Sequence, residues 1–249
     1  STQAKTLFPY TTLFRSMVYY VYRLIDGKPT WVECAEYGSA NALKDMPVRL
    51  TINGTTIKFD NSMFEARTSG NDDSNPYPYF VENGITGLGA YQARLMILSG
   101  AYVHFSASNK SYRTMRSTTT QLRDDDPIEI SIGTLTSANF KWATPSNRDM
   151  LLVSDTHQAV VSSGNQAMTP KNVYMVQFAT QSVDTTVSPV LLDRNVLYTG
   201  RSFDDTRNVG EFRHSEFNSG IYVPNNLTDH LPSYLKGKPL VFIGSPTIN

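Results

Sequence analysis

The segment NVYMVQFA at residues 172–179 has apolar residues on both faces of a predicted strand. Successive side chains of a strand alternate between its two faces, so two apolar residues would lie on one face and three on the other. The pair is Val173 and Met175, and the set of three is Tyr174, Val176 and Phe178. We therefore predict that this strand is covered on both faces.

Extended segments flank this strand and predict a β-meander from Met150 to Thr199. Met150–Val153 and Gln158–Val161 are apolar runs on either side of Ser154–His157, which predicts a hairpin with a four-residue loop. Val187–Tyr198 adds further extended residues. We expect this meander to supply the hydrophobic core.

Two more hairpins are predicted near the N-terminus. In the first, Asp26-Gly27 joins residues 17–25 to residues 28–34. In the second, Asn53-Gly54 joins residues 48–52 to residues 55–59. An Asn-Gly pair allows positive φ at both turn positions, so the second is the strongest hairpin signal in the chain.

Helical structure is predicted at few places. Residues 39–46 favour a short helix, with Ser39 or Asn41 as its N-cap and Pro47 beyond its end. Residues 88–105 fit either a helix that ends at Gly100 or a hairpin around Ser99-Gly100. We favour the hairpin, because the residues after the turn are strand-like.

Four segments are read in the rest of the chain. Residues 128–132 alternate, with three isoleucines on one face, and predict a strand. Residues 202–218 are polar and predict a long loop or an irregular edge. Residues 221–223 predict a short strand that Pro224 ends, and residues 239–244 predict a last buried strand.

The predicted fold is all-β, a sandwich or barrel-like meander of short antiparallel strands with at most one or two short helices. Residues 6–16 resemble the in-frame translation of a common sequencing-library adapter, and Met17 follows at once. We therefore treat residues 1–16 as a non-native leader. Residues 17–249 would form a single β-rich domain, with residues 67–78 and 108–127 as the alternative points of division.

Charge and composition exclude several classes of protein. Removing Lys5 and Arg15 from the 22 basic residues leaves 20 against 22 acidic residues, a net charge of −2. This balance argues against a nucleic-acid partner, because such proteins need a basic surface. Cys34 is the only cysteine, so no intramolecular disulfide is predicted. No apolar run approaches the roughly 20 residues of a membrane-spanning helix, so no membrane insertion is expected.

Motifs for catalysis are absent from the sequence, and we predict that the chain is not an enzyme and takes no cofactor. It has no Gly-x-Ser-x-Gly elbow, P-loop or dinucleotide fingerprint. The four histidines lack the spacing of a zinc site, and no metal site is predicted. Asp155-x-His157, His214-x-Glu216 and Asp229-His230 are local acid–histidine pairs that a folded site would have to bring together.

The loop at residues 67–78 and the aromatics that follow it are the candidate ligand-binding region. Aromatic rings with a polar rim suit the faces and hydroxyl groups of sugars. The candidate residues are Asn71, Asp72, Asp73, Tyr77 and Tyr79. The alternative is that Tyr79 and Phe80 begin a core strand.

Charged clusters have two interpretations each. Asp124–Asp126 lacks the alternating pattern of a calcium loop, so a solvated turn is favoured. Arg113, Arg116 and Arg123 would suit an anionic ligand, but a solvated strand face is favoured.

A family resemblance gives the main functional expectation. Leu151–Gly164 and Val187–Gly200 resemble bacteriophage tail-fibre and receptor-binding proteins, in which apolar strand pairs alternate with polar turns. The resemblance implies a virion structural or appendage protein that is assembled in the host cytoplasm. It also implies a homotrimer, contacts with other virion proteins, and binding to host-surface glycans or proteins.

Other classes of function remain open at this point. A secreted or cell-surface carbohydrate-binding β-sandwich, or an accessory domain of a polysaccharide-degrading enzyme, would suit the same strands. An enzyme with dispersed carboxylates is a third hypothesis, because the geometry of a carboxylate pair depends on the fold.

Overall fold

A computed structural model describes residues 5–8, 18–38, 46–60, 63–134, 137–202, 204–215 and 221–245 of the 249 residues. Within these ranges the chain consists of antiparallel strands and one short helix, α1 (Phe80–Asn83). The prediction of an all-β fold is therefore confirmed. In this part of the chain, no helix is long and apolar enough to cross a membrane.

The central sheet contains the predicted meander only as far as Ala179 and has the strand order β10-β11-β12-β13; the later part of the prediction, Val187–Tyr198, contributes strands to another sheet. Val153 pairs with Gln158, which leaves residues 154–157 as the four-residue loop that the sequence predicted. Pro145 lies on an edge strand of this sheet, where its missing N–H disrupts no ladder between strands. The four strands are β10 (Trp142–Ser146), β11 (Asp149–Val153), β12 (Gln158–Ser162) and β13 (Tyr174–Ala179).

The β6–β9 sheet decides between helix and hairpin at residues 88–105. The hairpin is confirmed, but Ser99 pairs with Tyr102, so its turn is Gly100-Ala101 rather than Ser99-Gly100. A further strand, β6, precedes this hairpin and was not predicted. The four strands are β6 (Gly87–Tyr91), β7 (Arg94–Ser99), β8 (Tyr102–Phe105) and β9 (Ile128–Ser131).

The β14–β18 sheet corrects the reading of residues 202–218. This segment contains β16, a nine-residue strand with partners on both sides, so the prediction of a loop was wrong. Pro224 also lies inside β17 rather than ending it, which an edge strand tolerates. The five strands are β14 (Val190–Leu192), β15 (Asn195–Arg201), β16 (Thr206–His214), β17 (Tyr222–Asn226) and β18 (Leu235–Lys236).

The last predicted strand, at residues 239–244, is wrong as well. This segment forms no strand, and Leu240, Val241 and Ile243 are exposed. Gly244 passes close to Val190 of β14, so the chain follows the edge of the sheet without pairing with it. Its apolar composition favours a strand, but a strand also needs a neighbouring strand, and the described residues provide none for this segment.

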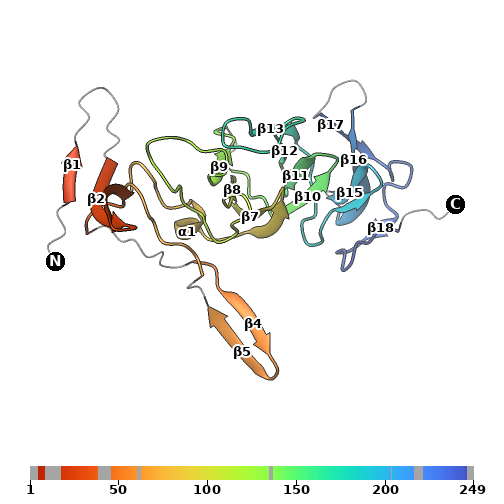
Figure 1. Cartoon of the computed structure of the whole chain (residues 1–249). Coiled ribbons are helices and arrows are strands. Elements are labelled where there is room, and N and C mark those ends of the chain that lie inside the picture. The colour runs from red at the N-terminus through yellow and green to blue at the C-terminus, as the bar shows by residue number, and fades with distance from the viewer. Residues whose placement is uncertain are drawn as a thin grey trace.

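The three sheets are stacked, with the central sheet in the middle (Figure 1). One core lies between the β6–β9 sheet and the central sheet and includes Phe105, Phe140 and Leu152. The other lies between the central sheet and the β14–β18 sheet and includes Leu151 and Phe212. Every residue of β11 and β12 is buried as a result.

The prediction that residues 172–179 are covered on both faces is wrong for β13. Tyr174 and Val176 are exposed on one face of β13. β13 is the edge strand of the central sheet, and Phe178 is its residue that packs against the core shared with the β14–β18 sheet. Two apolar side chains of the central meander are thus left without cover.

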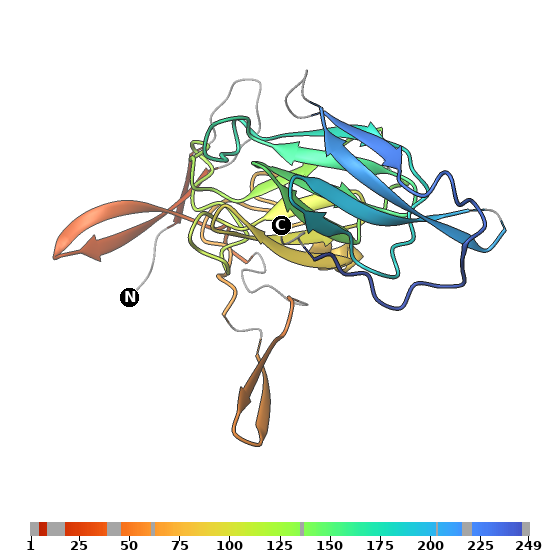
Figure 2. The ribbon, with the colours of Figure 1, turned by 90° about the vertical axis from the view of Figure 1, so that its right-hand side faces the viewer.

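Two hairpins project from the stacked sheets in different directions (Figure 2). The first joins β2 (Val18–Ile25) to β3 (Lys28–Cys34), and β1 (Lys5–Phe8) pairs with β2. The second joins β4 (Arg49–Asn53) to β5 (Thr56–Asp60). Both predicted hairpins are confirmed.

The turn of the second hairpin lies one residue later than predicted. Asn53 pairs with Thr56, so the two turn residues are Gly54 and Thr55, and Gly54 has the positive φ of 61°. A glycine at the first turn position is one of the two favoured two-residue turns. The predicted helix at residues 39–46 falls mainly on residues 39–45, which lie outside the described ranges.

The loops that were considered as points of division contact each other. The side-chain amide of Asn75 donates to the backbone carbonyl of Arg116 (3.0 Å), and the Arg116 N–H donates back to Asn75 Oδ1 (3.1 Å). These bonds join residues 67–78 to residues 108–127. Whether residues 17–249 form one domain stays a prediction.

Candidate functional site

The predicted ligand-binding loop is organised by its own hydrogen bonds. Asn71 Oδ1 accepts the backbone N–H groups of Asp73 (3.2 Å) and Ser74 (3.1 Å), which is a local turn stabilised by an Asn side chain. The Asn71 amide also donates to the Tyr19 hydroxyl (3.3 Å). Asp73 is exposed at the tip of this turn.

The aromatic residues of this region are also engaged within the chain. The Arg67 guanidinium lies 4.3 Å from the ring centre of Tyr77 and forms an ion pair with Asp72. The ring of Tyr79 is stacked on Tyr102 at a centroid distance of 3.9 Å. A role of Asn71, Asp72, Asp73, Tyr77 and Tyr79 in ligand binding stays a prediction.

The alternative reading of Tyr79 and Phe80 was partly right. Phe80 is buried and packs in a small core with Met46 and Ile97. It belongs to helix α1 and not to a strand, with Tyr79 at the N-cap position. This core covers the face of the β6–β9 sheet that points away from the central sheet.

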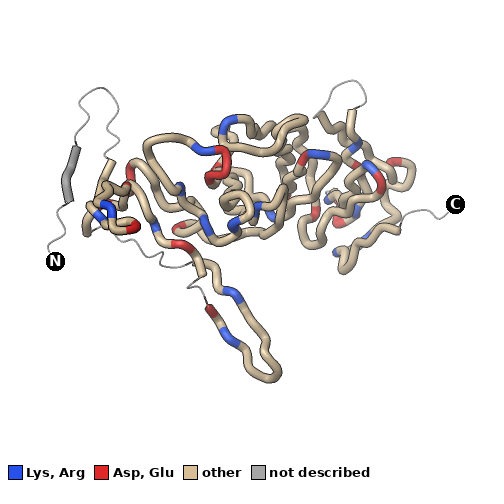
Figure 3. Tube along the Cα trace, viewed as in Figure 1, with Lys and Arg blue, Asp and Glu red and all other residues tan. Residues whose placement is uncertain are grey.

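The basic and acidic clusters bind each other, so each solvated reading is right only in part: Arg123 and Asp124 are exposed, whereas Arg113 and Asp126 are buried. The Arg113 guanidinium lies 3.3 Å from Asp125 Oδ2 and 3.5 Å from Asp126 Oδ1. Asp126 is fully buried, and its Oδ2 accepts the Arg123 N–H (2.9 Å). Burial raises the pKa of Asp125, but the positive charges of Arg123 and Arg113 outweigh it and hold that pKa below its usual value. The acidic turn is the continuous red segment near the middle of Figure 3.

Arg94 is buried beside this cluster and fastens loops from distant parts of the chain. Its Nη1 donates to the backbone carbonyls of Ser106 (2.8 Å) and Asp126 (2.7 Å). Its Nη2 donates to the carbonyls of Asp124 (3.0 Å) and Met168 (3.3 Å). Burial lowers the pKa of Arg94, and the nearby Asp125 and Asp126 carboxylates oppose this change.

A second buried ion pair stabilises the β14–β18 sheet. Asp184 Oδ2 accepts from Arg207 Nε (2.9 Å), and its other carboxylate oxygen accepts from the backbone and hydroxyl of Thr186. Burial raises the pKa of Asp184, but the hydrogen bonds from Thr186 and Arg207 outweigh burial, and the pKa lies below its usual value. This pair explains why the polar residue Arg207 sits in a buried strand position.

Acid should therefore destabilise the protein through Asp184. The carboxyl binds a proton more weakly when folded, so its stabilising effect is complete above the unfolded pKa of about 3.9 and is lost as the pH falls further. Urea unfolding measured from pH 7 to pH 3 should show a weaker pH dependence for Asp184→Asn than for the wild type. The exposed Asp193→Asn is the matched control, and an equal pH dependence in all three proteins would contradict the assignment.

The histidines do not form a common site. His157 Nδ1 lies 2.8 Å from the Thr156 hydroxyl, whereas Asp155 interacts with Lys141 and Thr185. His104 is buried, with its Nδ1 3.4 Å from Glu129. The partner predicted for His214, at position 216, lies outside the described ranges. Among the residues that the structure describes, no group of three or more His, Cys, Asp or Glu is placed to hold a metal ion.

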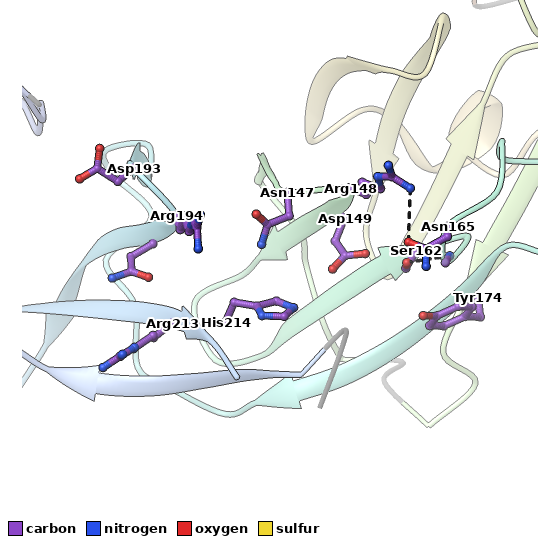
Figure 4. Close-up of a pocket in the computed structure, with 12 residues that line it drawn as sticks. Asn147, Arg148, Asp149, Ser162, Asn165, Tyr174, Asp193, Arg194, Arg213 and His214 are labelled. Atoms are coloured by element: carbon purple, nitrogen blue, oxygen red, sulfur yellow. Dashed lines mark hydrogen bonds between the residues drawn. The ribbon is translucent and has the colours of Figure 1, made fainter. Parts of the chain in front are cut away.

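A polar cleft of about 690 Å³ lies where the central sheet meets the β14–β18 sheet (Figure 4). Two-residue turns form part of its wall, Asn147-Arg148 between β10 and β11 and Asp193-Arg194 between β14 and β15. Asp149, which also lines the cleft, accepts a hydrogen bond from the Tyr222 hydroxyl (3.1 Å), and burial raises the pKa of Tyr222 to about 12. The residues that line the cleft are almost all polar or charged, which suits contact with a polar surface more than with an apolar ligand.

The most unusual surface is the β4–β5 hairpin, which we call the projecting hairpin. Leu50 pairs with Phe59 and Ile52 pairs with Ile57, so these four side chains lie on one face of the two strands. They are 51%, 73%, 68% and 55% exposed, respectively. Leaving such a side chain in water forgoes about 1.5–3 kcal/mol relative to burying it. The surface therefore has the composition of an interface.

The sequence contained the signal for this surface. Apolar residues alternate with polar ones in residues 49–53 and 56–60, and this pattern predicts an apolar face. It was read as a hairpin only, because alternation cannot show whether another part of the chain covers that face. The structure supplies the missing information by placing the hairpin away from the stacked sheets (Figure 1).

Comparisons with known proteins identify the family. The chain matches the family described as bacteriophage nozzle protein over residues 15–249. It is 27% identical over 183 residues to the tail tubular protein gp12 of Escherichia phage T7, an alignment that covers 74% of this chain and 23% of the T7 protein. The predictions of a phage virion structural protein and of a chain that is not an enzyme are confirmed. The comparisons do not support a tail fibre specifically. Because the match covers nearly all of the sequence, the chain belongs to the bacteriophage nozzle protein family.

Proposed function

We propose that this chain forms part of the wall of a phage tail conduit, in which several copies surround a channel. The family match and the relative named as a tail tubular protein support this proposal. The chain spans 23% of that relative, so the proposal concerns the segment in hand and not a whole tail protein.

The packing of the sheets is compatible with a wall segment. Side chains fill both interfaces between the three stacked sheets, with Phe105, Phe140 and Leu152 in one core and Leu151 and Phe212 in the other. A channel wide enough for a tail conduit would therefore have to form between copies and not inside the described part of one chain. Soluble assemblies of this kind are usually closed and symmetric.

The observation that carries the proposal is the exposed apolar face of the projecting hairpin. Monomeric proteins seldom expose a contiguous set of large apolar side chains, and such a surface marks contact with another molecule. Tyr22, Leu24 and Trp31 of the β2–β3 hairpin are exposed as well. A chain with these surfaces is expected to assemble.

The test is the solution mass of the chain, measured by light scattering on a sizing column, followed by electron microscopy of the assembled fraction. We expect an oligomer with a central channel. A compact trimer without a channel that retains host-surface glycans would favour the tail-fibre resemblance instead. A monodisperse monomer at all accessible concentrations would contradict the conduit proposal.

A further inference from the structure

We infer that the apolar face of the projecting hairpin binds a second copy of this chain. The inference rests on the proposed function, because it names the contact through which copies would assemble. It goes further by assigning that contact to four side chains, Leu50, Ile52, Ile57 and Phe59.

The two faces of the projecting hairpin differ sharply in chemistry. Arg49 pairs with Asp60 and Thr51 with Lys58, so the face opposite the apolar side chains is polar. Arg49 and Asp60 also approach within 3.9 Å as an exposed ion pair. One face is thus suited to water and the other to a partner.

The projecting hairpin has little support from its own chain. β4 pairs with β5 alone among the described strands, and an isolated two-stranded hairpin is marginally stable in water. Figures 1 and 2 show it extending away from the stacked sheets, so its apolar face is not turned onto either core. Binding to a partner would supply the cover that a third strand or a second layer supplies elsewhere in the fold.

A second copy of the chain is the partner that the observations favour. The body of the chain presents exposed apolar residues of its own, including Tyr174 and Val176 on the half-covered face of β13. These residues lie far from the hairpin in the fold, so contact between the two surfaces within one chain is not what the structure shows (Figure 1). A contact between different surfaces of neighbouring copies is the kind that builds rings and tubes. Figure 3 shows few charged residues on the hairpin, so no strong charge would repel another copy.

The first experiment compares assembly of the full chain with and without the apolar face. Ile52→Thr combined with Phe59→Thr keeps residues that favour strands but removes two apolar side chains. We expect the concentration at half-assembly to rise about tenfold or more, because central apolar anchors dominate interfaces. Thr51→Ser combined with Lys58→Thr, on the polar face, is the matched control and should assemble as the wild type does.

Thermal unfolding separates this effect from misfolding. The hairpin contributes no residue to the cores between the stacked sheets, so the melting temperature of dilute, unassembled protein should be the same for both double variants and the wild type. A large fall in melting temperature for Ile52→Thr with Phe59→Thr would show that the face is covered within the chain and would overturn the inference.

The second experiment identifies the partner directly. Phe59 is replaced by the photo-crosslinking residue benzoylphenylalanine, and equal amounts of isotopically light and heavy chain are mixed before irradiation. Crosslinked peptides that join a light chain to a heavy chain are the expected result. Crosslinks confined to one chain, or none in a sample that has assembled, would overturn the inference while leaving the conduit proposal standing. A wild-type chain that never assembles would contradict the conduit proposal itself.

Discussion

Replacing Arg94 by methionine should lower the free energy of unfolding by about 3–5 kcal/mol, because it leaves buried backbone carbonyls without a hydrogen-bond donor. The guanidinium donates to four backbone carbonyls, from Ser106, Asp124, Asp126 and Met168. Methionine fills similar space but donates no hydrogen bond, so these carbonyls would be left without this partner. It would also remove a positive charge that lies near the buried Asp126.

Urea unfolding followed by fluorescence measures this loss. Arg94→Lys should fall between the wild type and Arg94→Met, since an ammonium group carries the charge but cannot reproduce the fork of a guanidinium. Arg23→Met, at an exposed position on β2, is the control and should change the free energy by no more than about 0.5 kcal/mol. A loss below about 1 kcal/mol for Arg94→Met would mean that water replaces the guanidinium at the carbonyls.

Leu152→Ala should lower the free energy of unfolding by about 2–5 kcal/mol, the range for a buried leucine that leaves a cavity. Leu152 is fully buried on β11, in the core between the β6–β9 sheet and the central sheet. Its strand is enclosed on both sides, so the neighbouring side chains have little freedom to collapse into the space.

Leu191→Ala is the matched control for this prediction. Leu191 is an exposed leucine on β14, and its truncation should cost no more than about 0.5 kcal/mol. Equal losses for the two leucines in denaturant unfolding would contradict the placement of β11 between two cores.

Local patterns predicted much of the fold. Strand-like runs on either side of Asp26-Gly27 and of residues 154–157 predicted two hairpins that the structure contains, because strand propensity and turn residues are properties of neighbouring residues. The all-β class followed from the same signals. The stacking of three sheets was beyond reach, because it depends on which apolar faces meet across the chain.

The errors have specific physical causes. Residues 206–214 look like a loop because of their polar residues, yet Arg207 is buried there by its ion pair with Asp184. Residues 239–244 look like a core strand because they are apolar, yet no described strand pairs with them. A partner that lies elsewhere in the sequence decides both cases.

The candidate site was the least predictable feature. Tyr77 and Tyr79 were chosen as aromatics beside a polar loop, but the structure engages them with Arg67 and Tyr102. The apolar face of residues 49–60 was visible in the alternation, whereas its exposure was not. Exposure is a property of the whole fold, so sequence patterns marked the face but not its use.

The burial of β11 and β12 between two cores determines how this protein unfolds. Neither strand can leave its place without opening the cores on both of its sides, so the three sheets are expected to melt as a single cooperative unit. The projecting hairpin lies outside that unit and can open by local fluctuation while the rest stays intact. The chain thus joins three rigid stacked sheets to a flexible hairpin. A second copy that binds the hairpin would therefore not have to distort the packing of the sheets.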